Sequence, residues 1–265
     1  MIGIISSTLD ATSNNMAERL LENPEFEPHK INGKDGFRNG KLFLLRLSSP
    51  LIGAEIDSFG FEVAYFLSKH KSANNVPALT THSLGNWTGE AKIGGKPFEL
   101  SFAAPLEMLG MLRGISRIDA QIEKTYEATH HGPLLKTPSL FVELGGDDAT
   151  IQNRELAHRL ADSVYSSITN EVEYQKCVVG VGSTHYPEKF TALALEKGYA
   201  FSHIMPKHAI LNEDGTDNLQ MLEQALTRSK NPPELAVVDW KSINAEIKNR
   251  VLGELNRIGL DHEKV

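Results

Sequence analysis

Cysteine is almost absent from this chain, because Cys177 is the single one among 265 residues. This count excludes an intrachain disulfide and a zinc site built from several cysteines. Cys177 lies in an apolar run, and we therefore do not expect a covalent acyl-enzyme at its thiol. The same scarcity is typical of a reducing compartment, so we expect a cytoplasmic protein.

Long apolar runs and an excess of basic residues are also missing. No stretch approaches a membrane-spanning length, and the first residues, MIGIISSTLD, lack the basic start and apolar core of a signal peptide. The formal net charge of −7 argues against a protein that coats nucleic acid non-specifically. We expect a soluble, unprocessed chain that binds neither membranes nor DNA. No heptad seam demands an oligomer, and we expect a monomer.

The residues that are present favour one large α/β domain over residues 1–265. A hydrophobic fraction of 40% is enough for a substantial core. Apolar periodicity predicts strands at 2–5, 41–47, 62–67, 78–81, 98–102, 139–144, 176–181 and 235–238. It predicts helices through Met16 to Leu21 and at 106–126, 151–168, 218–228 and 243–258. This alternation favours a layered α/β domain with a mixed sheet. The turn-rich residues 22–40 resemble a surface excursion.

Two adjacent histidines, His130 and His131, follow the longest helical pattern and precede Gly132 and Pro133. Gly132 and Pro133 favour a turn on which both rings could face one cavity. Imidazole can accept a proton from water or bind zinc, and Glu143 lies one short strand away. Equally, one histidine could cap the helix and the other could pack in the core.

A second candidate is the small-residue stretch from Gly180 to Pro187, which directly follows an apolar strand pattern. Backbone amides in such a loop can approach a phosphate or an oxyanion, and His185 would stand at its edge. The stretch matches neither a Walker loop nor the dinucleotide-binding glycine pattern. A plain strand-to-helix turn is the alternative.

Polar side chains also end several other predicted strands. Lys69, His70 and Lys71 follow one strand, His82 follows another, and Lys207 and His208 follow an apolar run. Ligands of open α/β sheets bind at the carboxyl ends of strands, so these groups could converge in one crevice. Unrelated loop ends scattered around the sheet would give the same sequence.

Taken in order, FLSKHKS, PALTTHSLGN, YEATHHGP, VGVGSTHYPEKFT and MPKHAI resemble the archaeal and plant type of D-aminoacyl-tRNA deacylase over nearly the whole chain. The resemblance implies a three-layer α/β/α sandwich with a mixed sheet, related to phosphorylases and peptidyl-tRNA hydrolases. It also implies hydrolysis of the ester between a D-amino acid and tRNA, and a zinc requirement. Ser183 and Thr184 depart from the family pattern, because we expect glycines at their positions.

Combined with this resemblance, the residues suggest direct attack by water on an ester that is already activated. His130 and His131 would bind zinc or orient the water, with Glu143 as a further ligand and His185 as a third ligand or a base. The amides of Gly182, Ser183 and Thr184 would hold the oxyanion. Contacts with the tRNA acceptor end are predicted for Lys69, His70, Lys71, His82, Lys136, Lys189 and Lys207.

Two other functions are compatible with the residues. A phosphorylase- or nucleosidase-like enzyme would use the Gly180 to Tyr186 stretch for phosphate and His185 as an acid. A non-catalytic module would bind RNA ends, with histidines that only stack or donate hydrogen bonds.

Overall fold

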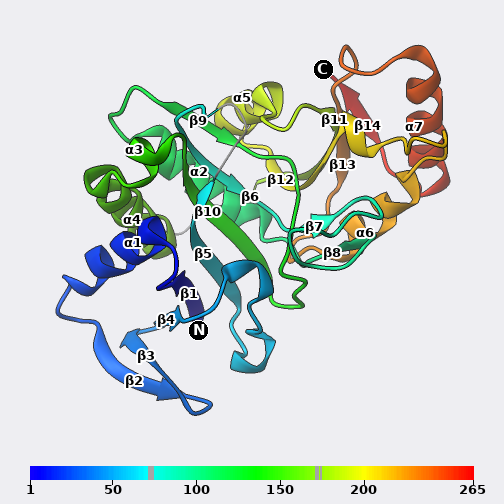
Figure 1. Cartoon of the computed structure of the whole chain (residues 1–265). Coiled ribbons are helices and arrows are strands. Elements are labelled where there is room, and N and C mark those ends of the chain that lie inside the picture. Colours follow the sequence, from blue (N-terminus) through cyan, green and yellow to red (C-terminus); the bar gives the residue numbers. More distant parts are fainter. Residues whose placement is uncertain (71–74, 171–172, 174) are drawn as a thin grey trace.

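The computed structural model describes residues 1–70, 75–170, 173 and 175–265, so the predicted tRNA contact Lys71 lies outside the described residues. The described strands form a large sheet, a small sheet and a short two-stranded ribbon of β7 (Gly85–Asn86) and β8 (Glu99–Leu100) (Figure 1).

The large sheet has eight strands in the order β2-β3-β4-β1-β5-β10-β6-β9. The strands β4, β1, β5 and β10 run parallel, β6 is antiparallel to β10, and β9 is parallel to β6. The sheet is therefore mixed, as predicted. In chain order the bounds are β1 Ile2–Ser7, β2 Glu27–Ile31, β3 Lys34–Asn39, β4 Leu42–Leu47, β5 Val63–His70, β6 Ala78–His82, β9 Glu123–Tyr126 and β10 Ser139–Gly145.

The small sheet has four parallel strands in the order β12-β11-β13-β14. Their bounds are β11 Cys177–Ser183, β12 Ala200–Pro206, β13 Leu235–Val238 and β14 His262–Lys264. Side chains from both sheets, among them Leu140 of β10 and Phe201 of β12, belong to one buried cluster, so the two sheets share a hydrophobic core.

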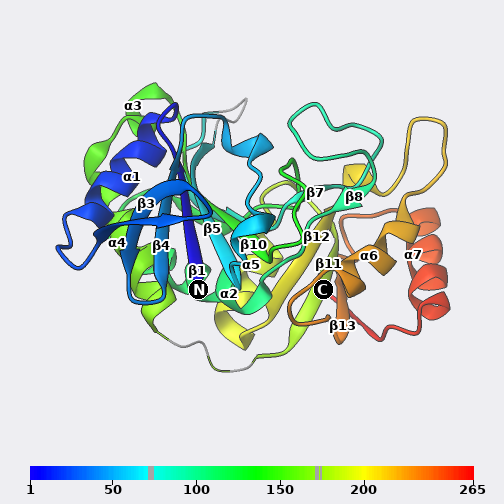
Figure 2. The ribbon, with the colours of Figure 1, turned by 90° about the horizontal axis from the view of Figure 1, so that it is seen from below.

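Helices cover the sheets on the faces that the sequence makes apolar. The helices α1 (Ala11–Leu21), α2 (Pro105–Ser116) and α4 (Arg154–Thr169) pack on one face of the large sheet (Figure 2). The small sheet lies between α2 and α5 (Glu188–Lys197) on one side and α6 (Leu222–Thr227) and α7 (Ala245–Arg257) on the other. The short helix α3 (Asp148–Ile151) precedes α4.

The layered α/β fold class is thus confirmed. Helices cover both faces of the small sheet. On the second face of the large sheet, short 3-10 turns at Leu51–Gly53 and Asp57–Phe59 and the adjoining segments take the place of helices.

Two predicted elements are wrong. The single helix over 106–126 ends at Ser116, and Glu123–Tyr126 forms β9 instead. Thr125 pairs with Thr80 in the sheet, and Ile118 and Ile122 face the same core as the helix does, so apolar spacing alone could not separate helix from strand. Residues 98–102 likewise form only the two-residue strand β8.

Residues 22–40 are not a plain surface excursion, because β2 and β3 form a hairpin that extends the large sheet beside β4. Asn32 and Gly33 turn this hairpin with φ of 50° and 76°. An Asn-Gly pair is the strongest short hairpin signal, and it stands in the sequence between Ile31 and Lys34.

The packing of β11 generates a stability prediction. A Cβ on Gly180 would lie 2.7 Å from Cε2 of Phe190, which is fully buried. We expect Gly180→Ala to lower the free energy of unfolding by roughly 1–3 kcal/mol, because the ring has no space to retreat into.

The control is Gly253→Ala on the exposed face of α7, where no atom outside the helix's own backbone lies within 4 Å of the added Cβ. The control should be neutral or stabilising by up to about 1 kcal/mol. Urea unfolding measures both, and equal stability of the two variants would contradict this packing.

Candidate functional site

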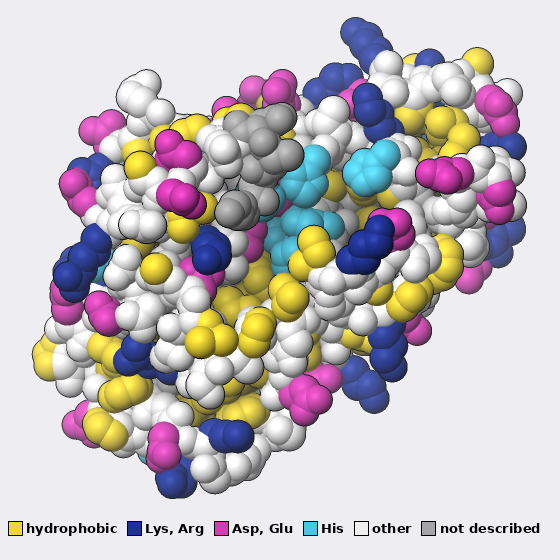
Figure 3. All heavy atoms as spheres, in the orientation of Figure 1, with side chains coloured by type: hydrophobic (Ala, Val, Ile, Leu, Met, Phe, Trp, Pro, Cys, Tyr) yellow, Lys and Arg dark blue, Asp and Glu magenta, His cyan; other side chains and the backbone are white. Residues whose placement is uncertain are grey.

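Five histidines from distant parts of the chain lie with their rings close together. Figure 3 shows histidine side chains at a hollow in the surface. His70 ends β5 and His82 ends β6, whereas His130 and His131 follow β9 and His185 follows β11. The centroid of the His130 ring lies 4.8 Å from that of His185 and 4.2 Å from that of His82. The predicted convergence of remote imidazoles is therefore present in the fold.

The turn that carries the histidine pair depends on a close approach of two loops. His131 has φ of 44°, in the left-handed region, and a Cβ on Gly132 would lie 2.1 Å from the backbone nitrogen of Gly95. Glycine is required at position 132 because only hydrogen fits there. His130 and His131 both line the adjacent pocket, as the turn predicted.

Glu127 is the buried carboxylate at the centre of the histidines. Its Oε2 lies 3.0 Å from Nε2 of His185, 3.2 Å from Nδ1 of His70 and 3.5 Å from Nε2 of His130. The sequence interpretation missed this residue, because the predicted helix ended at residue 126 and Glu127 was given no role. Its position three residues before His130, directly after a strand, is the signal that would have found it.

Glu143 is a second buried carboxylate, and its Oε2 lies 3.3 Å from Nδ1 of His70 and 3.6 Å from Nε2 of His82. Burial by itself would raise the pKa of Glu143, but the imidazoles of His70 and His82 hold this pKa well below its usual range. The carboxylate in turn raises the pKa of His70 and of His82 against the effect of their burial.

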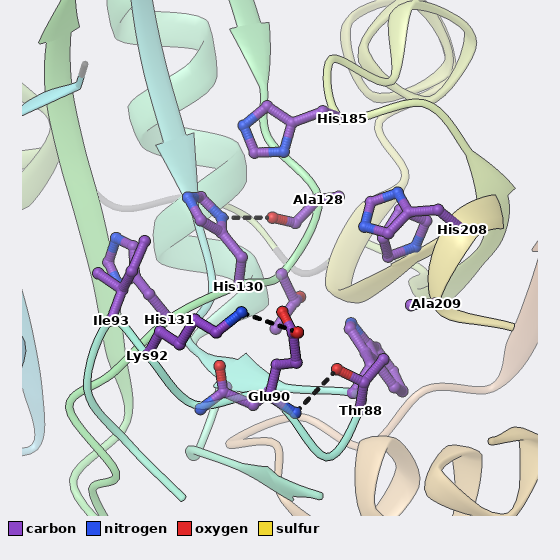
Figure 4. A pocket seen from close by; sticks show the side chains of 15 residues that line it. Thr88, Glu90, Lys92, Ile93, Ala128, His130, His131, His185, His208 and Ala209 are labelled. Carbon is purple, nitrogen blue, oxygen red and sulfur yellow. Dashed lines mark hydrogen bonds and ion pairs between the residues drawn. The ribbon is translucent and has the colours of Figure 1, made fainter. Parts of the chain in front are cut away.

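Backbone carbonyls fix the orientation of three of the rings. In His82, Nδ1 lies 3.0 Å from the carbonyl oxygen of Ser83, and in His131 it lies 2.6 Å from that of Gly132. In His130, Nδ1 lies 2.8 Å from the carbonyl oxygen of Ala128 (Figure 4). A carbonyl oxygen only accepts, so each Nδ1 carries the proton and each Nε2 is left to face the cluster. Burial lowers the pKa of His130 and lowers that of His131 to about 4, so both rings are neutral at physiological pH.

This arrangement brings acceptor atoms face to face. Both carboxylate oxygens of Glu127 and Oε2 of Glu143 are buried and make no hydrogen bond. Buried carboxylate oxygens and the lone pairs of imidazole nitrogens repel one another when they face each other. A cation between them removes this repulsion. Three sets of ligand atoms, each within 4.8 Å of one another, could hold a metal ion: Glu127 with His70, His130 and His185; the trio His82, His130 and His131; and the trio His82, Glu127 and Glu143.

Beside the cluster lies a pocket of about 390 Å³. Figure 4 shows His130, His131 and His185 on one side of it, His208 on another, and Thr88 and Glu90 below. Its volume is in the range of small-ligand sites. The histidines therefore border a space that can take the end of a substrate.

The predicted oxyanion loop has a different structure. β11 runs on through Gly182 to Ser183, and Gly182 lies against Ser242 and Ile243. The hydroxyl of Thr184 donates to the carbonyl oxygen of Tyr186. Gly182, Ser183 and Thr184 do not line the pocket, so the expectation of a loop beginning at Gly180 is wrong. Of this stretch, His185 lines the pocket and Tyr186 lies beside the rings of His70 and His185.

The predicted tRNA contacts do not form one surface. His82 has no exposed surface, so it cannot meet a phosphate, and His70 is almost as buried. Lys69 pairs with Leu144 near the carboxyl end of β10, whereas Lys136 precedes the opposite end of that strand. Lys189 forms an ion pair with Asp239. Lys207 is exposed and precedes His208 of the pocket.

Comparison with known proteins agrees with this geometry. The family model described as D-aminoacyl-tRNA deacylase matches residues 58–263. The chain belongs to the D-aminoacyl-tRNA deacylase family. A D-aminoacyl-tRNA deacylase of Pyrococcus furiosus is 33% identical over 98% of both chains, and one of Hyperthermus butylicus is 34% identical over 86% of this chain and 83% of its own length.

The family's fold is also found among solved structures. A crystal structure described as a conserved protein of unknown function matches with a TM-score of 0.89 and 28% identity, over 100% of this chain and 95% of that one. No helix among the described residues has the length and apolar character that a membrane crossing requires.

Cys177 lies outside this site and gives a simple chemical test. Its side chain is 1% exposed, and burial raises the pKa of the thiol to about 11. We expect an aromatic disulfide reagent to modify native protein slowly at pH 8 and to modify one thiol at once in denaturant, because the thiolate is the reactive form. Fast labelling of the folded protein would contradict the burial.

Proposed function

We propose that this protein hydrolyses the ester bond of D-aminoacyl-tRNA and releases the D-amino acid and free tRNA. The observation that carries the proposal is membership of the deacylase family over nearly the whole chain. The histidine and carboxylate cluster beside a small pocket supplies groups suited to hydrolysis. The family match disfavours the phosphorylase-like alternative.

We further propose zinc as the cation of the cluster. Glu127, His70 and His130 would be the protein ligands, so only His130 is shared with the predicted set of His130, His131, His185 and Glu143. Three ligands and an open position are typical of catalytic zinc sites. A bound zinc ion would supply Lewis-acid polarisation of the ester carbonyl.

The remaining groups suit proton transfer and hydrolysis by water. Among the histidines that face the two carboxylates, His185 is the most exposed. The exposed fraction of its side chain is 42%, against 26% for His130 and 10% for His70. His185 can therefore accept a proton from water and pass it to solvent, while Glu127 stabilises the imidazolium. The described pocket lining contains neither serine nor cysteine, which favours direct attack by water.

The tRNA would approach with its acceptor end. Lys69, next to His70, and Lys207, next to His208, are the exposed predicted lysines that flank the cluster. We propose that they contact the last phosphates before the ester. A cytoplasmic location fits this substrate.

The decisive test of the function uses D-tyrosyl-tRNA and L-tyrosyl-tRNA with the purified protein. We expect rapid release of D-tyrosine and little change in the L form over the same time, measured as free amino acid. Equal stability of the two esters, with correctly folded protein, would reject the proposed function.

The metal proposal has its own test. Protein purified without chelator should contain zinc by elemental analysis, and Glu127→Gln should lower its zinc affinity by more than the roughly 10–100-fold that outer partners contribute. The control Glu123→Gln changes an exposed carboxylate on β9, the strand that ends just before Glu127, and should keep the metal. Chelator should abolish deacylation and added zinc should restore it. Full activity in demonstrably metal-free protein would eliminate zinc.

A further inference from the structure

Trp240 and two lysines form a cationic surface that the site described above does not use. Nζ of Lys264 lies 4.2 Å from the centre of the Trp240 ring, and Nζ of Lys248 lies 5.0 Å from it. The two ammonium groups are thus closer together than about 10 Å, the Debye length in 0.1 M salt, and they repel each other. We call Trp240, Lys248 and Lys264 the Trp240 surface.

No side-chain carboxylate among the described residues forms an ion pair with these lysines, and the last residue, Val265, lies against the surface with its oxygen accepting from the amide of Trp240. Most arginines of the chain are in ion pairs, but within residues 1–70, 75–170, 173 and 175–265 no ion pair includes Lys248 or Lys264. The nearby Asp239 is bound by Lys189, and Glu246 of α7 is bound by Arg250. Cation–π contact with the indole holds the ammonium groups in place but leaves their charge free.

The fold places this surface next to the cluster. Val238, at the end of β13, pairs with Val181 of β11 on one side and with Lys264 of β14 on the other. Trp240 follows Val238 by two residues, and His185 follows the end of β11 by two residues. Neighbouring strands are on the order of 5 Å apart, so His185 and Trp240 emerge from the same edge of the small sheet. Figure 3 shows dark blue side chains near the end of β14, close to the cyan histidines.

Two neighbouring cations that form no side-chain ion pair, in a chain of net charge −7, attract an anionic ligand. The proposed substrate brings a line of phosphates that continues outward from the ester. We infer that the Trp240 surface binds the phosphate backbone of the tRNA acceptor arm, beyond the nucleotide that carries the amino acid. This inference rests on the proposed function and adds the docking direction: the arm leaves the pocket past His185 and over the carboxyl ends of β13 and β14.

The test compares Lys248→Ala/Lys264→Ala with wild-type protein in binding to uncharged tRNA over a range of KCl concentrations. The slope of log affinity against log salt should become shallower by about 1.4–1.8 for two lost phosphate contacts. Lys248→Arg/Lys264→Arg keeps the charges and should keep the slope. Lys34→Ala removes an exposed lysine of β3 that has no predicted tRNA contact, and it should leave the slope unchanged. An unchanged slope in the double alanine variant would overturn the inference.

Kinetics with two substrates make the test specific. The double alanine variant should raise KM for D-tyrosyl-tRNA and leave kcat/KM for the short ester D-tyrosyl-adenosine as in wild type, because the short ester has no phosphate to reach the surface. An equal loss on both esters would overturn the inference. Failure of wild-type protein to hydrolyse either ester would reject the proposed function, while the salt slope with uncharged tRNA would still decide the docking surface.

Discussion

The placement of two buried carboxylates among five imidazoles is the constraint on which the rest of this structure depends. A carboxylate is costly to bury unless charge or hydrogen bonds compensate it, and here His70 and His82 stabilise Glu143 while Glu127 faces His70, His130 and His185. Removal of one member would leave its partners buried without compensation. The burial of these charges therefore ties the geometry of the cluster to the packing around it.

The segment that follows β9 makes this arrangement possible. The amide of Glu127 donates to Thr81 of the large sheet, whereas the amides of Ala128 and Thr129 donate to His185 and Ile204 of the small-sheet region. These three consecutive hydrogen bonds join the two sheets directly behind the cluster. Rigid strands thus hold the imidazoles, which suits catalysis that depends on fixed positions.

Glycine has a structural use at this junction. Gly132 allows the histidine turn to touch the loop at Gly95, and Gly180 gives space to Phe190 behind β11. Both positions follow from close packing of the pieces that carry the site. The glycines that suggested an anion-binding loop are thus explained by packing.

Local sequence determined a large part of this protein. Apolar alternation gave most strands, the motif THHGP gave the turn with both histidines, and polar residues at strand ends indicated where a crevice would form. The hairpin at Asn32 and Gly33 was also encoded locally, although the turn-rich composition concealed it. The resemblance of the motifs to the deacylase family agreed with the later match over nearly the whole chain.

Tertiary structure alone decided which polar residues belong together. Glu127 became a cluster residue because β9 pairs with β6, and His82 is part of the cluster because its ring is buried against Glu143. Lys69 and Lys136 looked equivalent in sequence but lie toward opposite ends of β10. Periodicity reports which face of an element is apolar, whereas distances between remote side chains are set by strand order and register, and these depend on contacts across the whole chain.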